Sequence, residues 1–235
     1  NKPYPTFNDK WYSSTDVIAT ISKVTSDIVQ TVSPHVEEKY IPHAVNTEVF
    51  YKYKPTDIVP MQRVEEKLKD INNNGRFLFF WNNRNARRKQ SGALLFWFKE
   101  FLDKVGNDKA QLLMHTDLND PNGQPLAVIA EHLGLTKGEV VFSTMKVDPH
   151  HMADFYNMAD CTLNISDAEG FGLATLESLS CETPIIVNMT GGLQEQVTDG
   201  ENWFGIGINP ASKSIIGSLT VPWIYEDRIN KEDFV

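Results

Sequence analysis

From residue 77 onward, short runs of apolar residues alternate with longer stretches whose apolar residues recur at helical spacing. The short runs predict strands at 77–81, 111–116, 140–143, 161–165 and 184–188. The longer stretches predict helices at 92–105, 126–133, 150–159 and 172–181. Strands and helices that alternate in this way form right-handed βαβ crossovers. The pattern therefore predicts an α/β fold with a doubly wound parallel sheet.

The first 60 residues follow a different pattern. Residues 17–22 predict a strand and residues 25–32 a helix that a Ser/Thr-rich segment caps. Prolines and a Tyr-Lys-Tyr-Lys run then interrupt the periodicity, which predicts an irregular connection. We expect the end of one domain at 1–46, a linker at 47–60 and a second, incomplete domain at 61–235. Because the chain starts with Asn1 and stops at Val235, after a predicted helical turn, we expect both ends to be cut.

The segment from Glu169 to Glu177 is the most informative. It follows the predicted strand 161–165, carries Gly170 and Gly172 in a Gly-Phe-Gly turn, and leads into a helix. A helix N-terminus offers unpaired N–H groups and about half a positive charge, which suits a phosphate or a sugar hydroxyl. In a parallel sheet this turn shares one rim with the loops at 82–90, 143–147 and 188–192. An ordinary strand–helix turn with a solvated Glu177 remains an equal alternative from the spacing alone.

The loop after the predicted strand 77–81 carries four cations within six residues: Arg84, Arg87, Arg88 and Lys89. It is open to three interpretations: a nucleic-acid patch, a solvated loop or a diphosphate clamp. The net charge of −9 argues against nonspecific binding to nucleic acid or to an anionic membrane. Arginine and lysine suit phosphate oxygens, and the position of this loop on the rim favours the clamp.

Composition and motif content further narrow the class of protein to which the chain can belong. The chain is 41% hydrophobic and 23% charged, which is typical of a globular protein. No apolar run approaches the roughly 18 residues of a spanning helix and no signal-peptide pattern opens the chain, so we expect a cytoplasmic protein without a transmembrane segment. Cys161 and Cys181 predict buried thiols. His150 and His151 are adjacent and lack zinc spacing, and no metal site is predicted.

Taken in order and with their spacing, these residues resemble the retaining glycosyltransferases of family 4, whose GT-B fold has two facing Rossmann-like domains. The resemblance covers nearly the whole chain, as a remnant of the first domain and most of the second. The family has Gly, Pro and Gly where this chain has Asn83, Ala174 and Glu182. The matching segments are 40–46 with Phe50, Arg84 with Lys89, 155–160, Ser166, 169–173, Glu177, 183–184, and 191–192 with Glu195.

The resemblance implies transfer of a hexose-type sugar from a nucleotide-sugar donor to an acceptor hydroxyl, with retention at the anomeric carbon and without a metal ion or cofactor. By resemblance Arg84, Lys89 and Glu169 are the catalytic residues. Glu169 would orient the donor sugar, and Glu177 would hold the ribose. The remaining substrate-binding residues that the resemblance implies are Gly170, Phe171, Gly172, Leu173 and, against the base, Met145.

The acceptor stays open as a carbohydrate, a lipid or a protein, because the family's acceptor groove belongs to a domain that is mostly absent. We expect the isolated chain to be inactive for the same reason. Two other classes stay open at this point. The first is a sugar-nucleotide 2-epimerase or a phosphorylase, which share the two-domain architecture. A phosphorylase would carry a pyridoxal lysine, for which the chain shows no motif. The second is a non-catalytic module that binds nucleotide sugars.

Overall fold

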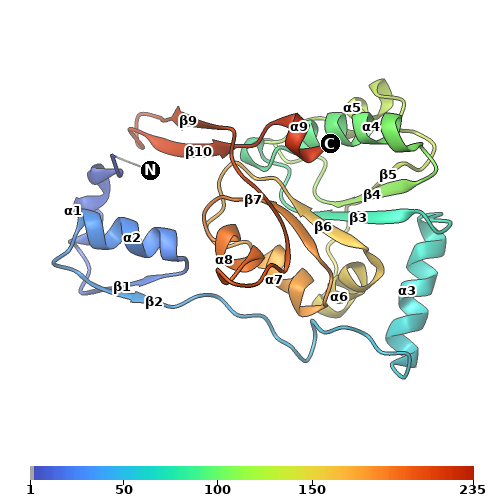
Figure 1. The fold of residues 1–235 in the computed structure, drawn as a ribbon, viewed down its shortest axis with the longest axis horizontal. Helices are drawn as coiled ribbons and strands as arrows, with labels where there is room; N and C mark the ends of the chain where they lie inside the picture. Colours follow the sequence, from blue (N-terminus) through green and yellow to red (C-terminus); the bar gives the residue numbers. More distant parts are fainter. Residues whose placement is uncertain (1–2) are drawn as a thin grey trace.

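The computed structural model describes residues 3–235, which form a small N-terminal α/β unit and a larger domain on a six-stranded sheet (Figure 1). The larger sheet is parallel throughout and has the strand order β5-β4-β3-β6-β7-β8. The predicted doubly wound α/β fold is confirmed. The strands are β3 (Phe77–Asn82), β4 (Ala110–His115), β5 (Val140–Ser143), β6 (Cys161–Asn164), β7 (Ile185–Asn188) and β8 (Gly205–Ile208).

Helices cover both faces of this sheet. One face packs against α4 (Ser91–Val105) and α5 (Leu126–His132). The other face packs against α3 (Ile58–Asp70), α6 (Pro149–Met158), α7 (Leu173–Ser180) and α8 (Leu193–Val197). Along β3, Phe79 and Trp81 face the first group of helices, whereas Leu78 and Phe80 face the second. Burial on both faces explains why the strands appear as continuous apolar runs in the sequence.

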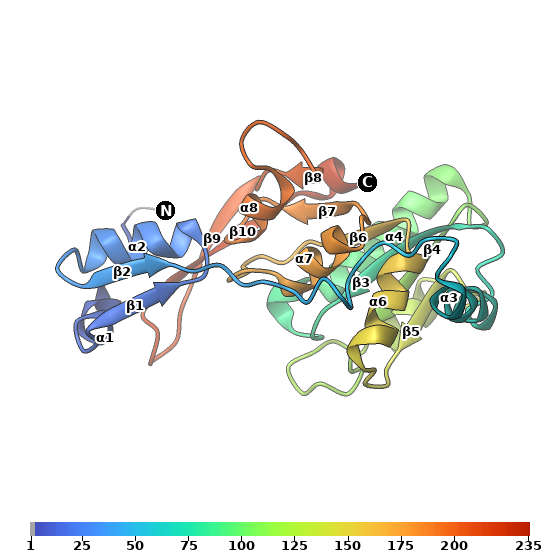
Figure 2. The ribbon, with the colours of Figure 1, turned by 90° about the horizontal axis from the view of Figure 1, so that it is seen from below.

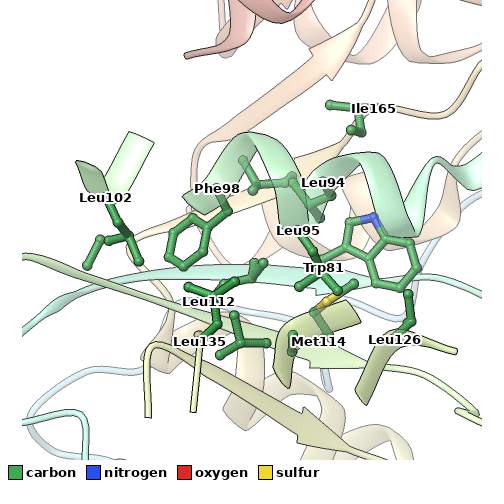
Figure 3. Close-up of a cluster of buried hydrophobic side chains, with 14 of the residues drawn as sticks. Trp81, Leu94, Leu95, Phe98, Leu102, Leu112, Met114, Leu126, Leu135 and Ile165 are labelled. Carbon is green, nitrogen blue, oxygen red and sulfur yellow. The ribbon is translucent and has the colours of Figure 1, made fainter. Parts of the chain in front are cut away.

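The larger buried cluster lies between the sheet and α4 and α5 (Figure 3). Trp81 of β3 lies among Leu94 and Leu95 of α4, Met114 of β4 and Leu126 of α5, and all five are completely buried. A fully buried side chain of this kind contributes about 1.5–3 kcal/mol to folding. This packing fixes the end of β3 and therefore the point from which the basic loop departs.

The N-terminal unit consists of β1 (Val17–Thr20) and β2 (Glu37–Tyr40), which pair in parallel, and α2 (Lys23–Val32) between them. Two short helices, η1 (Thr6–Asn8) and α1 (Asp9–Tyr12), precede it. The Ser22 hydroxyl accepts a hydrogen bond of 3.3 Å from the Thr25 amide and caps α2, in agreement with the predicted cap. The sequence does not predict β2, because its Glu-Glu-Lys-Tyr segment is polar and largely exposed.

Residues 41–57 contain no helix or strand and connect the two parts. The next helix, α3, begins at Ile58, before residue 61, where the sequence analysis places the start of the second domain. The sequence analysis misses α3, because Pro60 and a polar surface obscure its periodicity. The division into 1–46, 47–60 and 61–235 stays a prediction.

Beyond β7 the sequence predicts only a helical turn at 231–235, and α9 (Lys231–Phe234) confirms it. The structure adds α8, β8 and an antiparallel hairpin of β9 (Ser212–Ile216) and β10 (Ile224–Arg228). Figure 2 shows the hairpin between the N-terminal unit and the larger sheet. Two glycines in β8 and three consecutive charged residues in β10 remove the apolar signal that a strand prediction needs.

Cys161 and Cys181 are free and buried, as predicted, and burial raises the pKa of each thiol to about 12. His150 and His151 lie exposed at the start of α6, where the Asp148 carboxylate accepts hydrogen bonds from both backbone amides. Within residues 3–235, no group of His, Cys, Asp and Glu side chains is arranged to hold a metal ion. The described part of the chain has no helix of the length and apolarity that crossing a membrane requires.

A buried ion cluster joins α3 to α6. The Asp154 carboxylate is fully buried and accepts two hydrogen bonds of 2.8 Å from Arg63, one of 2.8 Å from Lys67 and one of 2.9 Å from the Tyr53 hydroxyl. Burial raises the pKa of Asp154, but these donors together lower it further than burial raises it. The charged form of Asp154 therefore stabilises the folded state.

We expect Asp154→Ala to lower the free energy of unfolding at pH 7 by about 3 kcal/mol, because it leaves the partly buried Arg63 and Lys67 without their carboxylate. Denaturant unfolding measures this value. The matched control is Asp103→Ala: its exposed carboxylate pairs with Lys99 one helical turn away, and its loss is worth about 0.5 kcal/mol or less. Since the pKa of Asp154 is lowered in the folded state, the difference is present above the unfolded pKa of about 3.9 and disappears as pH falls through the folded value. Equal losses for the two variants would contradict a stabilising cluster.

Candidate functional site

The strand order of the larger sheet reverses between β3 and β6. From β3 the chain moves outward through β4 to β5, returns to β6 beside β3, and then moves outward through β7 to β8. At such a reversal the loops that leave the two central strands diverge, and ligands of open α/β sheets bind in the resulting crevice. The loops that meet there are 83–90 and 165–172, which hold most of the predicted site residues.

Lys89 and Glu169 form an ion pair that bridges these two loops. Lys89 is only 6% exposed, and burial lowers the pKa of its ammonium group while the charge of Glu169 opposes that shift. The Arg88 guanidinium lies 3.8 Å from the same carboxylate. An ammonium group has three donors and a carboxylate about four acceptor positions, so both groups keep hydrogen-bonding capacity for a ligand.

Further hydrogen bonds hold the two loops together around this pair. The Asp167 amide donates to the Arg88 carbonyl at 2.8 Å, and the Gln90 side chain donates to the Asp167 carboxylate at 2.5 Å. Arg88 also donates to the Ala168 carbonyl at 2.5 Å. The position of the ion pair is therefore determined by the backbones of both loops as well as by the two side chains.

The Gly-Phe-Gly turn lies between β6 and α7, as predicted. Gly172 has φ +92°, which favours glycine, and a Cβ atom there would lie 2.6 Å from the Leu193 side chain. Phe171 is buried and packs edge-on against His43 with ring centroids 5.1 Å apart. α7 then begins at Leu173, whose side chain is 45% exposed. The first N–H groups of α7 have no partner within the helix and can donate to a ligand.

Gly191 and Gly192, in the loop after β7, press against the backbone of Glu169. The Gly192 amide donates to the Glu169 carbonyl at 3.2 Å. Gly191 has φ +49°, and a Cβ atom there would lie 1.8 Å from the same carbonyl oxygen. A loop from a third strand therefore supports the candidate carboxylate.

Glu177 lies in α7 and contacts a different element. The Tyr156 hydroxyl of α6 donates to its carboxylate at 2.7 Å, and the Asn82 side chain donates to that hydroxyl at 3.0 Å. Burial raises the pKa of Glu177, and the hydrogen bond from Tyr156 opposes the shift. One carboxylate oxygen of Glu177 is thus held in a polar chain that starts at the end of β3.

The cations of the basic loop have different partners. Arg84 is exposed and forms a bidentate ion pair with Asp120, in the loop after β4. Arg87 forms a bidentate pair with Glu226 of β10. The structure therefore brings Lys89, but not Arg84, against Glu169.

Met145 lies in the loop after β5 and is 78% exposed. In the same region the His115 ring and the Ser143 hydroxyl are hydrogen-bonded at 2.9 Å, and burial lowers the pKa of His115. Since β5 is an edge strand two positions from β3, Met145 belongs to the far end of the rim. Its predicted contact with a nucleotide base stays a prediction.

A cleft of about 800 Å³ opens beside the loop after β6. This volume falls within the roughly 300–1,000 Å³ of small-molecule sites. Glu169 and Gly170 line it together with Thr190 and Gly191 of the loop after β7. Other walls come from the start of α2 and from the hairpin, through Ser22, Thr25, Asp27, Lys213, Tyr225 and Asp227.

The sequence analysis misses the hairpin residues of this cleft. Lys213, Tyr225 and Asp227 follow no strand–loop–helix pattern, so the parallel-sheet argument did not reach them. The one local signal was the dense charged run at 226–228 directly after an apolar segment.

The family model described as "Glycosyl transferases group 1" matches residues 66–217. A D-inositol 3-phosphate glycosyltransferase of Acidothermus cellulolyticus is 35% identical over 99 residues, which are 41% of this chain and 22% of that protein. An alpha-monoglucosyldiacylglycerol synthase of Acholeplasma laidlawii is 28% identical over 163 residues, which are 69% of this chain and 38% of that protein.

Solved structures share the fold. Sucrose-phosphate synthase from Thermosynechococcus elongatus aligns with a TM-score of 0.68 at 22% identity, over 87% of this chain and 48% of that one. Anabaena HepE in complex with UDP and glucose aligns with a TM-score of 0.69 at 16% identity, over 88% of this chain and 54% of that one. The chain thus spans about half the length of these structures and less than a quarter of the Acidothermus relative.

We expect Gly191→Ala to destabilise the protein and to displace the backbone of Glu169. The matched control is Gly200→Ala, which also has a positive φ, +100°, but has no atoms within 4 Å of an added Cβ. A left-handed alanine costs about 1–2 kcal/mol at either site. The overlap at Gly191 adds roughly 1–3 kcal/mol. Denaturant unfolding measures both losses, and equal values would contradict the contact between Gly191 and Glu169.

Proposed function

The chain belongs to the family of glycosyl transferases group 1, and on this premise we propose that it serves to transfer a sugar from a nucleotide-sugar donor to an acceptor hydroxyl with retention at the anomeric carbon. The observation that carries the proposal is the Lys89–Glu169 pair, which lies at the reversal of the sheet and whose Glu169 lines the large cleft. Membership of family 4, independence of a metal ion and a cytoplasmic location are further parts of this proposal.

The proposed chemistry is electrostatic. Departure of the nucleoside diphosphate puts negative charge on its β-phosphate, and donors that already point at this group lower the barrier. Lys89 and the amides of Gly172 and Leu173, at the start of α7, would supply such donors. Arg84 would join them by exchanging Asp120 for phosphate, since its side chain is exposed to solvent.

The two carboxylates would divide the donor between them. Glu169 lines the cleft and would accept hydrogen bonds from hydroxyls of the transferred sugar. Glu177 would accept hydrogen bonds from the ribose through the oxygen that Tyr156 does not occupy. Gly170 and Phe171 would let the donor approach the turn closely, and Met145 would lie against the base.

The relatives guide the choice of donor. HepE was solved with UDP and glucose, and two curated relatives are named D-inositol 3-phosphate glycosyltransferase and alpha-monoglucosyldiacylglycerol synthase. We therefore propose a nucleoside diphosphate sugar as donor and UDP-glucose as the first to test. The acceptor is left open.

In the full-length protein, we expect Lys89→Ala to raise the activation free energy for release of UDP from UDP-glucose by about 2.7–4 kcal/mol. The reason is the loss of a preformed hydrogen-bond donor to the β-phosphate. Arg84→Ala should raise this activation free energy as well. Steady-state kinetics measure the effect, and Lys109→Ala, an exposed lysine away from the rim, is the control. Unchanged turnover in both rim variants would show that the basic loop has a structural role only.

The carboxylate variants separate the two roles. Glu177→Ala should weaken binding of free UDP by about 1.5–3 kcal/mol, since hydrogen bonds to a charged group are lost. Glu169→Ala should leave that affinity nearly unchanged but slow turnover of UDP-glucose. Calorimetry with UDP, GDP and ADP measures the first quantity and kinetics the second. Equal effects of the two variants on nucleotide affinity would show that the division of roles is wrong.

A further inference from the structure

Strand β10 crosses the rim of the larger sheet and binds the loop that carries Lys89. The Glu226 carboxylate, only 1% exposed, accepts hydrogen bonds of 2.9 and 2.6 Å from the two terminal nitrogens of Arg87. Arg228 lies 3.3 Å from the same carboxylate. Because Arg87 is two residues before Lys89, the geometry of this bidentate pair constrains the position of Lys89.

The next residue of β10 binds the loop that carries Glu169. The Asp227 amide donates to the Asp167 carbonyl at 2.8 Å, and Asp167 is two residues before Glu169. The Asn188 side chain, at the end of β7, donates to both the Ser166 and the Asp227 carbonyls, at 2.8 and 2.7 Å. Neighbouring residues of one strand therefore hold the loops that supply each member of the ion pair.

Electrostatics make this docking specific. Asp167, Glu226 and Asp227 are all at least nine-tenths buried, and they face Arg87, Arg228 and Lys213. Buried carboxylates are tolerated only when cations and hydrogen-bond donors surround them. A hairpin in a shifted position would leave some of these charges unpaired, so the charges select one arrangement of the hairpin and both loops.

We propose that the β9–β10 hairpin is a positioning element for the Lys89–Glu169 pair and that Glu226 is the positioning residue through which it fixes the loop after β3. The family match ends at residue 217, so β10 lies outside the segment that the family model matches. The kinetic part of the test rests on the proposed function. The spectroscopic part does not.

The test uses the full-length protein and three variants. Glu226→Gln keeps the shape of the side chain and removes its charge. Arg87→Gln removes the same ion pair from the exposed side and keeps the proposal testable if Glu226→Gln does not fold. Glu232→Gln, at an exposed carboxylate just beyond β10, is the matched control.

The first readout is the pH titration of the Lys89 Cε resonance in ¹³C-lysine-labelled protein. In the wild type, burial lowers the pKa of Lys89. Looser loops admit water, so Glu226→Gln and Arg87→Gln should move this pKa upward, towards the usual value of about 10.4. Glu232→Gln should leave it in place.

The second readout is kcat/KM for release of UDP from UDP-glucose. We expect a loss of up to about 100-fold in Glu226→Gln and Arg87→Gln, mainly in kcat, since small displacements of reacting groups have effects of this size. The double variant should lose no more than the worse single variant, because both remove one interaction. The proposal would be overturned if Glu226→Gln and Arg87→Gln lost stability but had the same Lys89 pKa and the same kcat/KM as Glu232→Gln. Absence of UDP binding in the wild type would contradict the proposed function, while the Lys89 titration would still decide the role of the hairpin.

Discussion

A buried ammonium group has to be neutralised, and the arrangement of this rim follows from how Lys89 meets that requirement. Burying this charge without a partner would cost several kcal/mol. The loop after β3 can therefore bury Lys89 only when Glu169 lies beside it. The strand order makes this possible, because β3 and β6 are neighbours in the sheet. Phe79 pairs with Cys161 although the two residues are far apart in the sequence. Gly191 then has to be a glycine, because the carbonyl of Glu169 occupies the space of a side chain.

The two faces of the sheet serve this arrangement differently. On one face the apolar packing of Trp81 against α4 and α5 fixes the end of β3. On the other face, polar chains run between elements: Asn82 to Tyr156 to Glu177, and Arg63 to Asp154. Close packing of apolar side chains holds the elements rigidly but has no preferred direction, whereas hydrogen bonds to buried carboxylates are directional. The candidate site is thus supported by rigid packing and oriented by directional bonds.

The sequence predicts the parts of the fold whose signal is local. Strands β3 to β7 are buried on both faces, and α4 to α7 have regular apolar spacing, so periodicity finds them within one or two residues. It misses β2 and β10, whose stability comes from contacts with other segments, β1 for β2 and the loops at Arg87 and Asp167 for β10, rather than from apolar residues of their own. In the candidate site, it places Lys89 and Glu169 on one rim through the loops that follow strands, and the structure pairs them there. It cannot find the partners of Arg84 and Arg87, because 36 and 139 residues separate them from Asp120 and Glu226.

The relation between Glu169 and Glu177 shows why spacing alone was insufficient even within one motif. Eight positions on a continuous helix would place both carboxylates on broadly the same side. Here α7 begins only at Leu173, after the left-handed Gly172, so the helical period does not connect the two residues. Glu169 lies in the loop and contacts Lys89 at the cleft, whereas Glu177 lies in the helix and contacts Tyr156. A single turn therefore presents its two carboxylates to two different surroundings, which is the geometric basis for giving them different roles.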